Sequence, residues 1–300
     1  MKCFYHNDPD GFCSAYWVRK YCERENIEFV ESDFIEMNYD KEFPWDTLTP
    51  GEQIFMVDFS LNDSMNMALL DRDYQFTWID HHKTAIDKMG YDCKIKGIRR
   101  DGIAACALTW IWYTYGEIKE ETIKSGLPRF ENIIYDAPLF TQYIHLWDTW
   151  KWKNCEGPEH IEAFITALSA CNTNPIGYNS IWYLLDVMEN LFNDLVKEGH
   201  HMISFRNGYA NTCCDSIGKL IDFEGYRCFA CNMPKCNSEW FISVDPSTYD
   251  ILMPFYYNMQ TGQFSVSLYS SEVDVSKIAV KYGGGGHFLA SGFQCKSLPF

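Results

Sequence analysis

The feature that most constrains this fold is a short apolar run that ends in Asp80-His81-His82-Lys83. Residues 76–79 are apolar and β-prone, so they predict a buried strand with the polar group at its carboxyl end. Open α/β sheets bind ligands beyond the carboxyl ends of parallel strands, which makes this a candidate site. One Asp-His-His on its own is a common accident of protein surfaces, so it needs independent support.

Two other stretches provide that support because they have the same form. Residues 2–5 run into His6, Asp8 and Asp10, and a second apolar run leads into Asp58. His6, Asp8 and Asp10 alternate along the chain, so on an extended segment all three side chains would point the same way. Three predicted strands therefore end in a carboxylate, two of them with imidazole as well, and we expect these ends to meet.

The rest of the chain predicts an α/β fold in two parts. The N-terminal part is expected to hold a mostly parallel sheet with flanking helices, followed by a long connector helix and a smaller α/β C-terminal domain. The predicted boundaries are 1–185 for the first domain, 186–210 for the connector helix and 211–300 for the second domain. Predicted first-domain strands are residues 2–5, 27–30, 54–58 and 76–80, and predicted helices include 12–25, one with Met65, Met67, Leu69 and Leu70, much of 103–152, and 159–170. The sequence further predicts one helix from 180 to about 206. It then predicts strands at 219–223, 226–232, 251–257 and 264–269 and a helix at 275–281.

Composition and charge exclude several classes of protein. The 300 residues are 47% apolar, which indicates a globular protein, and no run approaches the ~18 apolar residues of a membrane span. The N-terminus lacks the apolar core of a signal peptide, so we expect a cytoplasmic protein. The net charge of −16 repels long polyphosphates, so a nucleotide substrate should be small and long duplex nucleic acid is not expected as a partner.

The 13 cysteines are scattered and odd in number, which is typical of reduced thiols. Cys228, Cys231 and Cys236 raise the alternative of a zinc site. A structural zinc needs four ligands, and the remaining pair, Cys213 and Cys214, is adjacent rather than spaced. Buried thiols on a strand are therefore the favoured interpretation.

Several carboxylates in one pocket cannot all stay ionised without cations, because like charges at short range repel. Carboxylate and imidazole donors without thiolate favour Mn²⁺, or Mg²⁺ and Co²⁺, over a structural zinc. A carboxylate placed between two such ions would bridge them, as in two-metal phosphoesterase sites.

These motifs resemble the DHH–DHHA1 family of phosphoesterases, and within it most closely the oligoribonuclease (nano-RNase) branch related to cyclic-nucleotide phosphodiesterases. The resemblance extends from His6 to Phe293, and its motifs occur in the same order. They are His6-Asn7-Asp8-Pro9-Asp10-Gly11, Val57-Asp58, Asp80-His81-His82-Lys83 and Gly283-Gly284-Gly285-Gly286-His287.

The resemblance implies two Mn²⁺ ions per chain in the first domain, with Mg²⁺ or Co²⁺ as alternatives, and a second domain that holds the nucleotide. Asp58 would bridge the two ions. The first ion would be bound by His6 and Asp8, and the second by Asp10, His81 and a later Asp, for which Asp148 is the candidate and Asp136 the alternative.

The same resemblance implies roles around the ions. Asp80 would orient its neighbours, and His82 would stabilise the scissile phosphate or protonate the leaving oxygen. The implied substrate-binding residues are Gly284, Gly285, Gly286, His287, Lys83 and Arg100. Tyr269 stands where many relatives carry an arginine, and Arg99 or Arg100 is the alternative source of that phosphate contact.

The expected function is hydrolysis of short oligonucleotides to mononucleotides by a metal-dependent phosphodiesterase. The alternatives are hydrolysis of cyclic mono-, di- or oligonucleotide signals, a pAp-type phosphatase, and a catalytically silent nucleotide-binding module. The expected partner is the nucleotide substrate, with no membrane, and the protein is expected to be a monomer or a homodimer.

Overall fold

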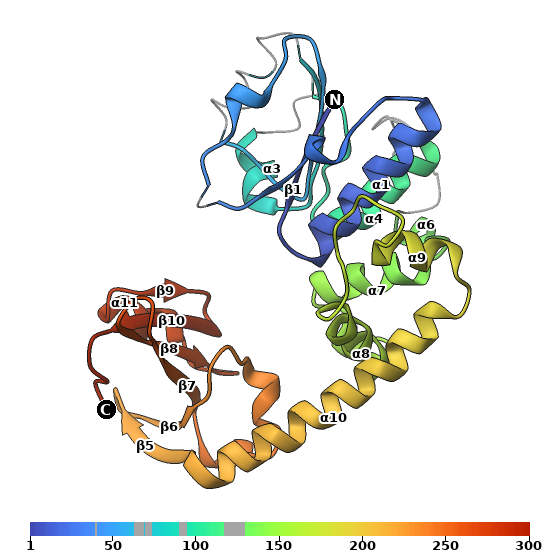
Figure 1. Ribbon diagram of the computed structural model, residues 1–300. Helices are drawn as coiled ribbons and strands as arrows, with labels where there is room; N and C mark the ends of the chain where they lie inside the picture. The colour runs from blue at the N-terminus through green and yellow to red at the C-terminus, as the bar shows by residue number, and fades with distance from the viewer. Residues whose placement is uncertain (40, 63–68, 70–73, 90–94, 117–129) are drawn as a thin grey trace. The chain divides into compact units, whose positions relative to one another are not determined.

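The computed structural model describes residues 1–300 except 40, 63–68, 70–73, 90–94 and 117–129. The chain divides into two compact units, Met1–His200 and His201–Phe300 (Figure 1). The first contains a parallel sheet with helices and the second a mixed sheet with helices, so the predicted α/β fold class is confirmed. Of the helices in the described part of the chain, none combines the length and apolar character needed to cross a bilayer.

Four described strands form the sheet of the first unit, all parallel and in the order β2-β1-β3-β4. They are β1 (Lys2–His6), β2 (Phe34–Met37), β3 (Gln53–Val57) and β4 (Gln75–Ile79). Phe4 lies opposite Ile35 on one side and Met56 on the other, and the side chains of Phe4, Met56 and Trp78 are buried in one core. Because the strands run parallel, their carboxyl ends lie at one edge of the sheet.

Helices cover this sheet, and α1 packs against α4 and against β1 and β3. The described helices of the unit are α1 (Pro9–Glu25), α3 (Lys83–Met89), α4 (Ala105–Tyr115), α6 (Phe130–Ile134), α7 (Leu139–Asp148), α8 (Pro158–Leu168) and α9 (Ile181–Val187). Helix α1 begins almost directly after β1, and a Cβ on Gly11 would lie only 2.1 Å from the His6 carbonyl oxygen. Glycine is therefore required for the helix to start this close to the strand.

The early start of α1 corrects the prediction that His6, Asp8 and Asp10 alternate on an extended segment. Asp8 is the N-cap of α1, and its carboxylate accepts a 2.9 Å hydrogen bond from the Gly11 N–H. Asp10 lies inside the first helical turn, where Pro9 and the capping carboxylate favour a helix start. The three side chains are thus arranged by a strand-to-helix turn.

Three other sequence predictions need correction or fall outside the described residues. The predicted strand at 27–30 is wrong: Val30 is exposed, and residues 34–37 pair with β1 instead. The single helix predicted from 180 to about 206 is two helices, because Met188 adopts an extended backbone after α9. The helix predicted to carry Met65, Met67, Leu69 and Leu70 cannot be compared with the structure, because only Leu69 of these four residues is among the described ones.

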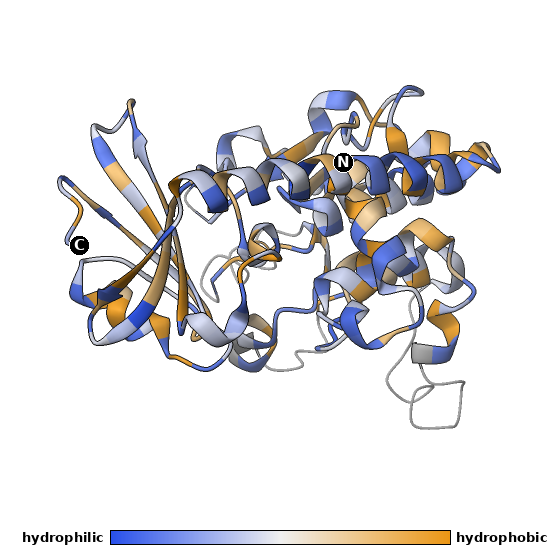
Figure 2. Cartoon of the chain, turned by 90° about the horizontal axis from the view of Figure 1, so that it is seen from below, coloured by the Kyte–Doolittle hydropathy of each residue, from blue (hydrophilic) through white to orange (hydrophobic). Residues whose placement is uncertain are grey.

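Helix α10 (Leu191–Ile217) contains the division between the two units, and apolar and hydrophilic residues are interspersed along it (Figure 2). The residue-level boundaries predicted for the domains and connector remain predictions. In the described residues the second sheet has the order β5-β6-β7-β8-β10-β9. Its elements are β5 (Lys219–Phe223), β6 (Tyr226–Asn232), β7 (Ile251–Asn258), β8 (Gln263–Tyr269), α11 (Val275–Lys281), β9 (Gly285–Gly286) and β10 (Ala290–Cys295).

The second sheet has a core on each face. One core contains Cys228 and residues of α11, and the other contains Cys231, Cys236 and the α10 residue Cys214. Cys228 and Cys231 therefore point to opposite faces of β6, since side chains alternate along a strand. These two thiols cannot share one zinc ion.

Candidate metal centre

The ends of β1, β3 and β4 bring carboxylates and imidazoles together, as their strand-end positions predict. On one side, His6 Nδ1 lies 2.8 Å from Asp8 Oδ2 and 3.9 Å from Asp58 Oδ2. Asp8 comes from the cap of α1 and Asp58 from the residue after β3. These three residues form a compact group with one nitrogen and two carboxylate ligands.

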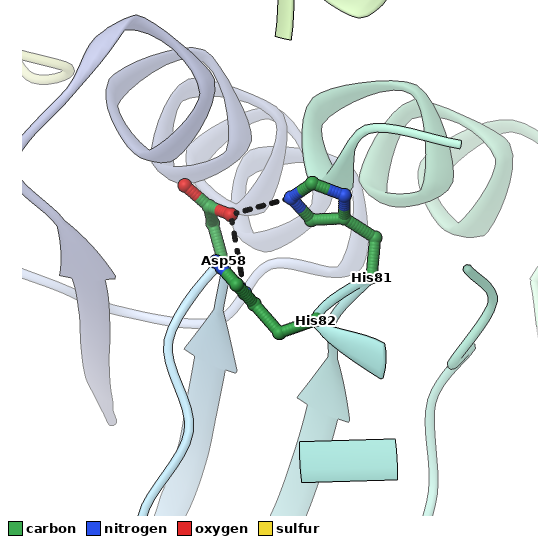
Figure 3. A group of neighbouring side chains, drawn as sticks. All are labelled: Asp58, His81 and His82. Carbon is green, nitrogen blue, oxygen red and sulfur yellow. Dashed lines mark ion pairs between the residues drawn. The ribbon is translucent and has the colours of Figure 1, made fainter. Parts of the chain in front are cut away.

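A second group forms around His81, which follows β4. Its Nε2 atom lies 3.3 Å from Asp58 Oδ1, 3.3 Å from Asp148 Oδ2 and 3.5 Å from Asp10 Oδ2. Figure 3 shows Asp58 reaching from the end of β3 toward His81 and His82. Asp58 thus contacts both groups, one through each carboxylate oxygen.

Asp58 has an unusual backbone conformation for this position. Its φ is +53°, in the left-handed region that costs most non-glycine residues about 1–2 kcal/mol. Its N–H donates to the Ile79 carbonyl over 3.0 Å, which fixes the turn against β4. Strain held in this way is typical of functional sites, and here it directs a buried carboxylate between the two groups.

Two carboxylate oxygens of this cluster are not satisfied by protein donors. Among the described residues, the buried Oδ2 atoms of Asp58 and Asp148 have no hydrogen-bond partner. A buried polar atom without a partner is costly, and ordered water or an ion usually satisfies it. Oxygen and imidazole ligands with no thiolate suit Mn²⁺ or Mg²⁺, so the residues present fit divalent cations.

Burial and mutual repulsion set the protonation of the cluster when no cation is bound. Burial, reinforced by Asp10 and Asp8, raises the pKa of Asp58 far above its usual range and that of Asp148 to about 8. The pKa of Asp8 instead falls, because hydrogen bonds from His6 and the Gly11 N–H outweigh its burial. The hydrogen bond to Asp8 correspondingly raises the pKa of His6.

Asp80 organises the residues that follow β4. Its fully buried carboxylate accepts from the N–H groups of His81 and His82, at 2.7 and 3.2 Å, and from Trp78 Nε1 at 3.2 Å. His82 Nδ1 is 2.7 Å from the same carboxylate, and this hydrogen bond raises the pKa of His82. With Nδ1 donating to Asp80, Nε2 is the atom left to face a ligand.

The start of α4 is a part of the site that the sequence did not reveal. The N–H groups of Ala105 and Cys106 donate to Asp10 over 2.8 and 2.7 Å, and that of Ala104 donates to His145 Nδ1 over 3.1 Å. Burial lowers the pKa of His145 to about 4, which keeps its imidazole neutral and able to accept. The available signal was indirect: α4 starts without a Ser, Thr, Asp or Asn cap, so other segments must supply its acceptors.

The structure also locates the residues that were predicted as phosphate contacts or as an alternative metal ligand in the first unit. Lys83 is exposed at the first turn of α3, and the backbone of Arg100 donates to the Asp80 carbonyl over 3.0 Å. Arg99 donates to the Trp78 and Ile95 carbonyls and stacks on Trp78, and its alternative role as a phosphate contact remains a prediction. Asp136, the alternative metal ligand, is exposed in the turn after α6, whereas Asp148 contacts His81.

The glycine segment belongs to the second unit. The Gly284 N–H donates to the Ala279 carbonyl over 2.9 Å, and the predicted role of this glycine in substrate binding remains a prediction. A Cβ on Gly284 would also lie 2.1 Å from the Gly292 carbonyl oxygen, which gives this glycine a packing role. Gly285 and Gly286 pair with β10, and the side chain of His287 is exposed. Tyr269 donates to the Cys236 carbonyl over 3.2 Å.

We expect the metal-free protein to lose stability as the pH rises from 6 to 8. The folded-state pKa of Asp148, about 8, is above the ~4 of an unfolded aspartate, so the folded chain binds this proton more tightly. That contribution is lost as the pH rises through the folded value, and the raised pKa values of His6 and His82 act in the same direction. The lowered pKa of Asp8 matters only below pH ~4.

Thermal unfolding in EDTA at pH 6, 7 and 8 measures this effect. The Asp148→Asn variant is the control, and its unfolding temperature should depend less on pH. Added Mn²⁺ should raise the unfolding temperature of the unaltered chain most at pH 8, where it competes with the fewest protons. A metal-free chain that becomes more stable from pH 6 to pH 8 would contradict the raised pKa of Asp148.

No family model matches this chain. An uncharacterized protein of Acanthamoeba polyphaga mimivirus is 24% identical over 97% of this chain and 67% of its own length. Among solved structures, the pGpG-specific phosphodiesterase PggH from Vibrio cholerae has a TM-score of 0.53 and 14% identity, covering 98% of this chain and 93% of its own. The DHH domain of a member of the s1p family of ribosomal proteins has a TM-score of 0.50 and 14% identity, covering 97% and 81%. The chain therefore shares the fold of these two structures, one of which is a DHH domain.

Proposed function

We propose that this protein is a Mn²⁺-dependent phosphodiesterase that hydrolyses short linear oligonucleotides to mononucleotides. The observation that carries the proposal is the shared position of Asp58, whose two oxygens face two separate groups of ligands. Two-metal sites that cleave phosphate esters need such a bridging carboxylate.

The distances divide the remaining residues between two ions. His6 and Asp8 would hold one ion, and Asp10, His81 and Asp148 the other. Asp8, Asp10, Asp58 and Asp148 bring four negative charges, which two divalent cations would balance. When bound, the ions would position the phosphate and make a water molecule acidic enough to attack phosphorus near neutral pH. Mn²⁺ is the proposed ion, with Mg²⁺ or Co²⁺ as alternatives.

His82 is placed to act on the substrate rather than as a ligand. Its Nδ1 donates to the buried Asp80, which holds the ring and raises its pKa. The proton on Nε2 is therefore available near neutral pH to stabilise the charge on the phosphate or to protonate the leaving oxygen. Asp80 positions His82 and does not itself contact the substrate.

Two features support a short linear substrate. The net charge of −16 opposes binding of long polyanions, so affinity must come from a few local contacts. The structurally similar PggH is described as specific for pGpG, which is a linear dinucleotide. Hydrolysis of a cyclic nucleotide needs the same ions and remains the main alternative.

A panel of linear and cyclic nucleotides tests the proposal directly. The purified chain is incubated with Mn²⁺ and each substrate, and the products are identified by chromatography. We expect linear di- and trinucleotides to yield mononucleotides. EDTA should abolish the reaction, and Mn²⁺ should restore it better than Ca²⁺, whose longer and looser coordination suits a compact two-metal site poorly. Preferential cleavage of a cyclic nucleotide over its linear product would favour the alternative.

A further inference from the structure

Two exposed aromatic side chains, Tyr39 and Trp150, lie beside the candidate metal centre of the first unit. Their exposed fractions are 60% and 74%. Isolated exposed rings are common on protein surfaces and need no function. These two differ from that background because each adjoins a different group of predicted ligands, and because the backbone of Trp150 is strained.

Trp150 is held in a backbone conformation that tryptophan disfavours. Helix α7 ends in a Schellman motif, in which the N–H groups of Trp150 and Lys151 donate to the carbonyls of Trp147 and Leu146 over 3.0 and 2.9 Å. The motif places Trp150 at φ +58°, in the position that glycine usually occupies. Burial of the side chain would offset this strain, but the indole is mostly exposed and makes no hydrogen bond or ring contact with any residue that the structure describes. Strain without compensation inside the fold is typical of functional residues.

The turn that carries Trp150 is tied to the metal centre on both sides. Asp148, two residues earlier, has its Oδ2 atom 3.3 Å from His81 Nε2. Lys151 Nζ donates to the Gly102 carbonyl over 2.6 Å, and that carbonyl lies just before the start of α4, which binds another carboxylate of the cluster. Trp150 therefore stands at the edge of the group of ligands around His81.

Tyr39 occupies the corresponding place beside the other group of ligands. It follows β2 by two residues, at the carboxyl edge of the sheet, and its ring centroid lies 5.8 Å from that of His6. Its ring packs against Phe59, with 4.9 Å between the centroids and 31° between the planes, and more than half of the side chain stays exposed. Phe59 directly follows Asp58, so the turn that places the bridging carboxylate also positions this ring.

We propose that Trp150 and Tyr39 stack on the two bases that flank the scissile phosphate of a dinucleotide. Such a substrate has one planar base on each side of the bond to be cleaved, and the metal centre has one exposed ring beside each group of ligands. Every base has a planar face, so stacking on aromatic rings holds bases with little regard to sequence. This inference rests on the proposed function for the class of substrate, and it adds two specificity residues from the first unit that the sequence motifs do not include. It requires a base on both sides of the phosphate, which separates a linear dinucleotide from a pAp-type substrate.

Dinucleotides in which one of the two nucleosides is abasic test this assignment. The values of kcat and KM are measured in Mn²⁺ for the complete dinucleotide and for each of the two abasic analogues. Trp150→Ala should raise KM for the complete dinucleotide on the order of tenfold, the contribution expected from stacking one base. It should leave KM unchanged for the analogue that lacks the base held by Trp150, and Tyr39→Ala should show the same pattern with the other analogue. Trp150→Phe and Tyr39→Phe should retain most of the affinity, because each keeps a ring.

Tyr135→Ala is the matched control. Tyr135 is 76% exposed in the turn before α7, at the opposite end of that helix from Asp148, so its loss should leave KM unchanged. Trp150→Gly should raise KM as Trp150→Ala does and also raise the unfolding temperature, because glycine adopts φ +58° without strain. An equal rise in KM on all three substrates, or no rise on any, would overturn the proposal. Unchanged KM with an altered oligomeric state would also overturn it and would indicate a protein interface.

Binding in Ca²⁺ keeps this test separate from the proposed enzymatic function, since Ca²⁺ suits the compact site poorly for turnover. Isothermal titration measures the affinity of the full chain for the dinucleotide and its abasic analogues. Base-dependent binding that both alanine variants weaken, in a chain that hydrolyses no dinucleotide in Mn²⁺, would support the two rings and reject the enzymatic function. Hydrolysis of dinucleotides with a KM that neither variant changes would reject the rings alone. A chain that neither binds nor hydrolyses dinucleotides would reject both proposals.

Discussion

Replacing Asp58 by asparagine is expected to lower turnover by at least about two orders of magnitude, the loss typical of removing one preorganised charge-stabilising group. A neutral amide bridges two cations poorly. The chain should remain folded, because asparagine is isosteric and tolerates the left-handed backbone that Asp58 adopts at φ +53°. In EDTA the variant should be more stable than the unaltered chain, since burial and repulsion from Asp10 destabilise the charged carboxylate.

The opposite directions of these two effects make the experiment specific. Turnover is measured in Mn²⁺, and thermal unfolding is measured in EDTA for the same preparation. Asp215→Asn, an exposed change on α10, is the control and should alter neither quantity. A folded Asp58→Asn variant that keeps more than a few per cent of the activity would rule out the bridging role.

The second large effect concerns substrate length. Hydrolysis should be fastest for linear substrates of about two to five nucleotides and should fall steeply for a 30-mer, because a surface with a net charge of −16 repels each added phosphate. Few phosphates would be neutralised by lysine or arginine, so few counterions are released on binding. The salt dependence of kcat/KM should therefore be shallow.

Initial rates across a length series at two or more salt concentrations measure both quantities. A steep salt slope together with ready degradation of the 30-mer would indicate a long-strand exonuclease. A wide preference for a closed ring over the corresponding linear product would indicate a cyclic-nucleotide enzyme. Each of these results would reject the proposed substrate while leaving the metal centre in place.

The sequence predicted the sheet and the strand-end cluster because both depend on local patterns. Apolar runs that end in Asp58 or in Asp80-His81-His82 are visible without tertiary information, and parallel strands bring such ends together. The runs at 27–30 and 34–37 show the limit of this reasoning. Both are apolar enough for a strand, and only pairing with β1 selects the second.

Other features depended on contacts between distant segments. Asp10 and His145 supply the acceptors for the start of α4, and they are about 95 and 41 residues away from it in sequence. Met188 gave no local signal that the helical stripe would break after α9. The strand β9 was missed because a glycine-rich run predicts a loop unless its partner strand, here β10, is known.

The aspartates at the strand ends differ in the hydrogen bonds that they accept. This difference predicts which of them other sequences of this fold should keep. Asp10 caps α4, so a chain without the proposed metal centre would still gain stability from keeping it. The Oδ2 atoms of Asp58 and Asp148 have no hydrogen-bond partner among the described residues, and burial makes ionisation of both carboxyls costly in a chain without cations. Selection for stability alone would therefore remove these two first. If the proposed metal centre is correct, retention of Asp58 and Asp148, more than of Asp10, should distinguish the sequences that keep it.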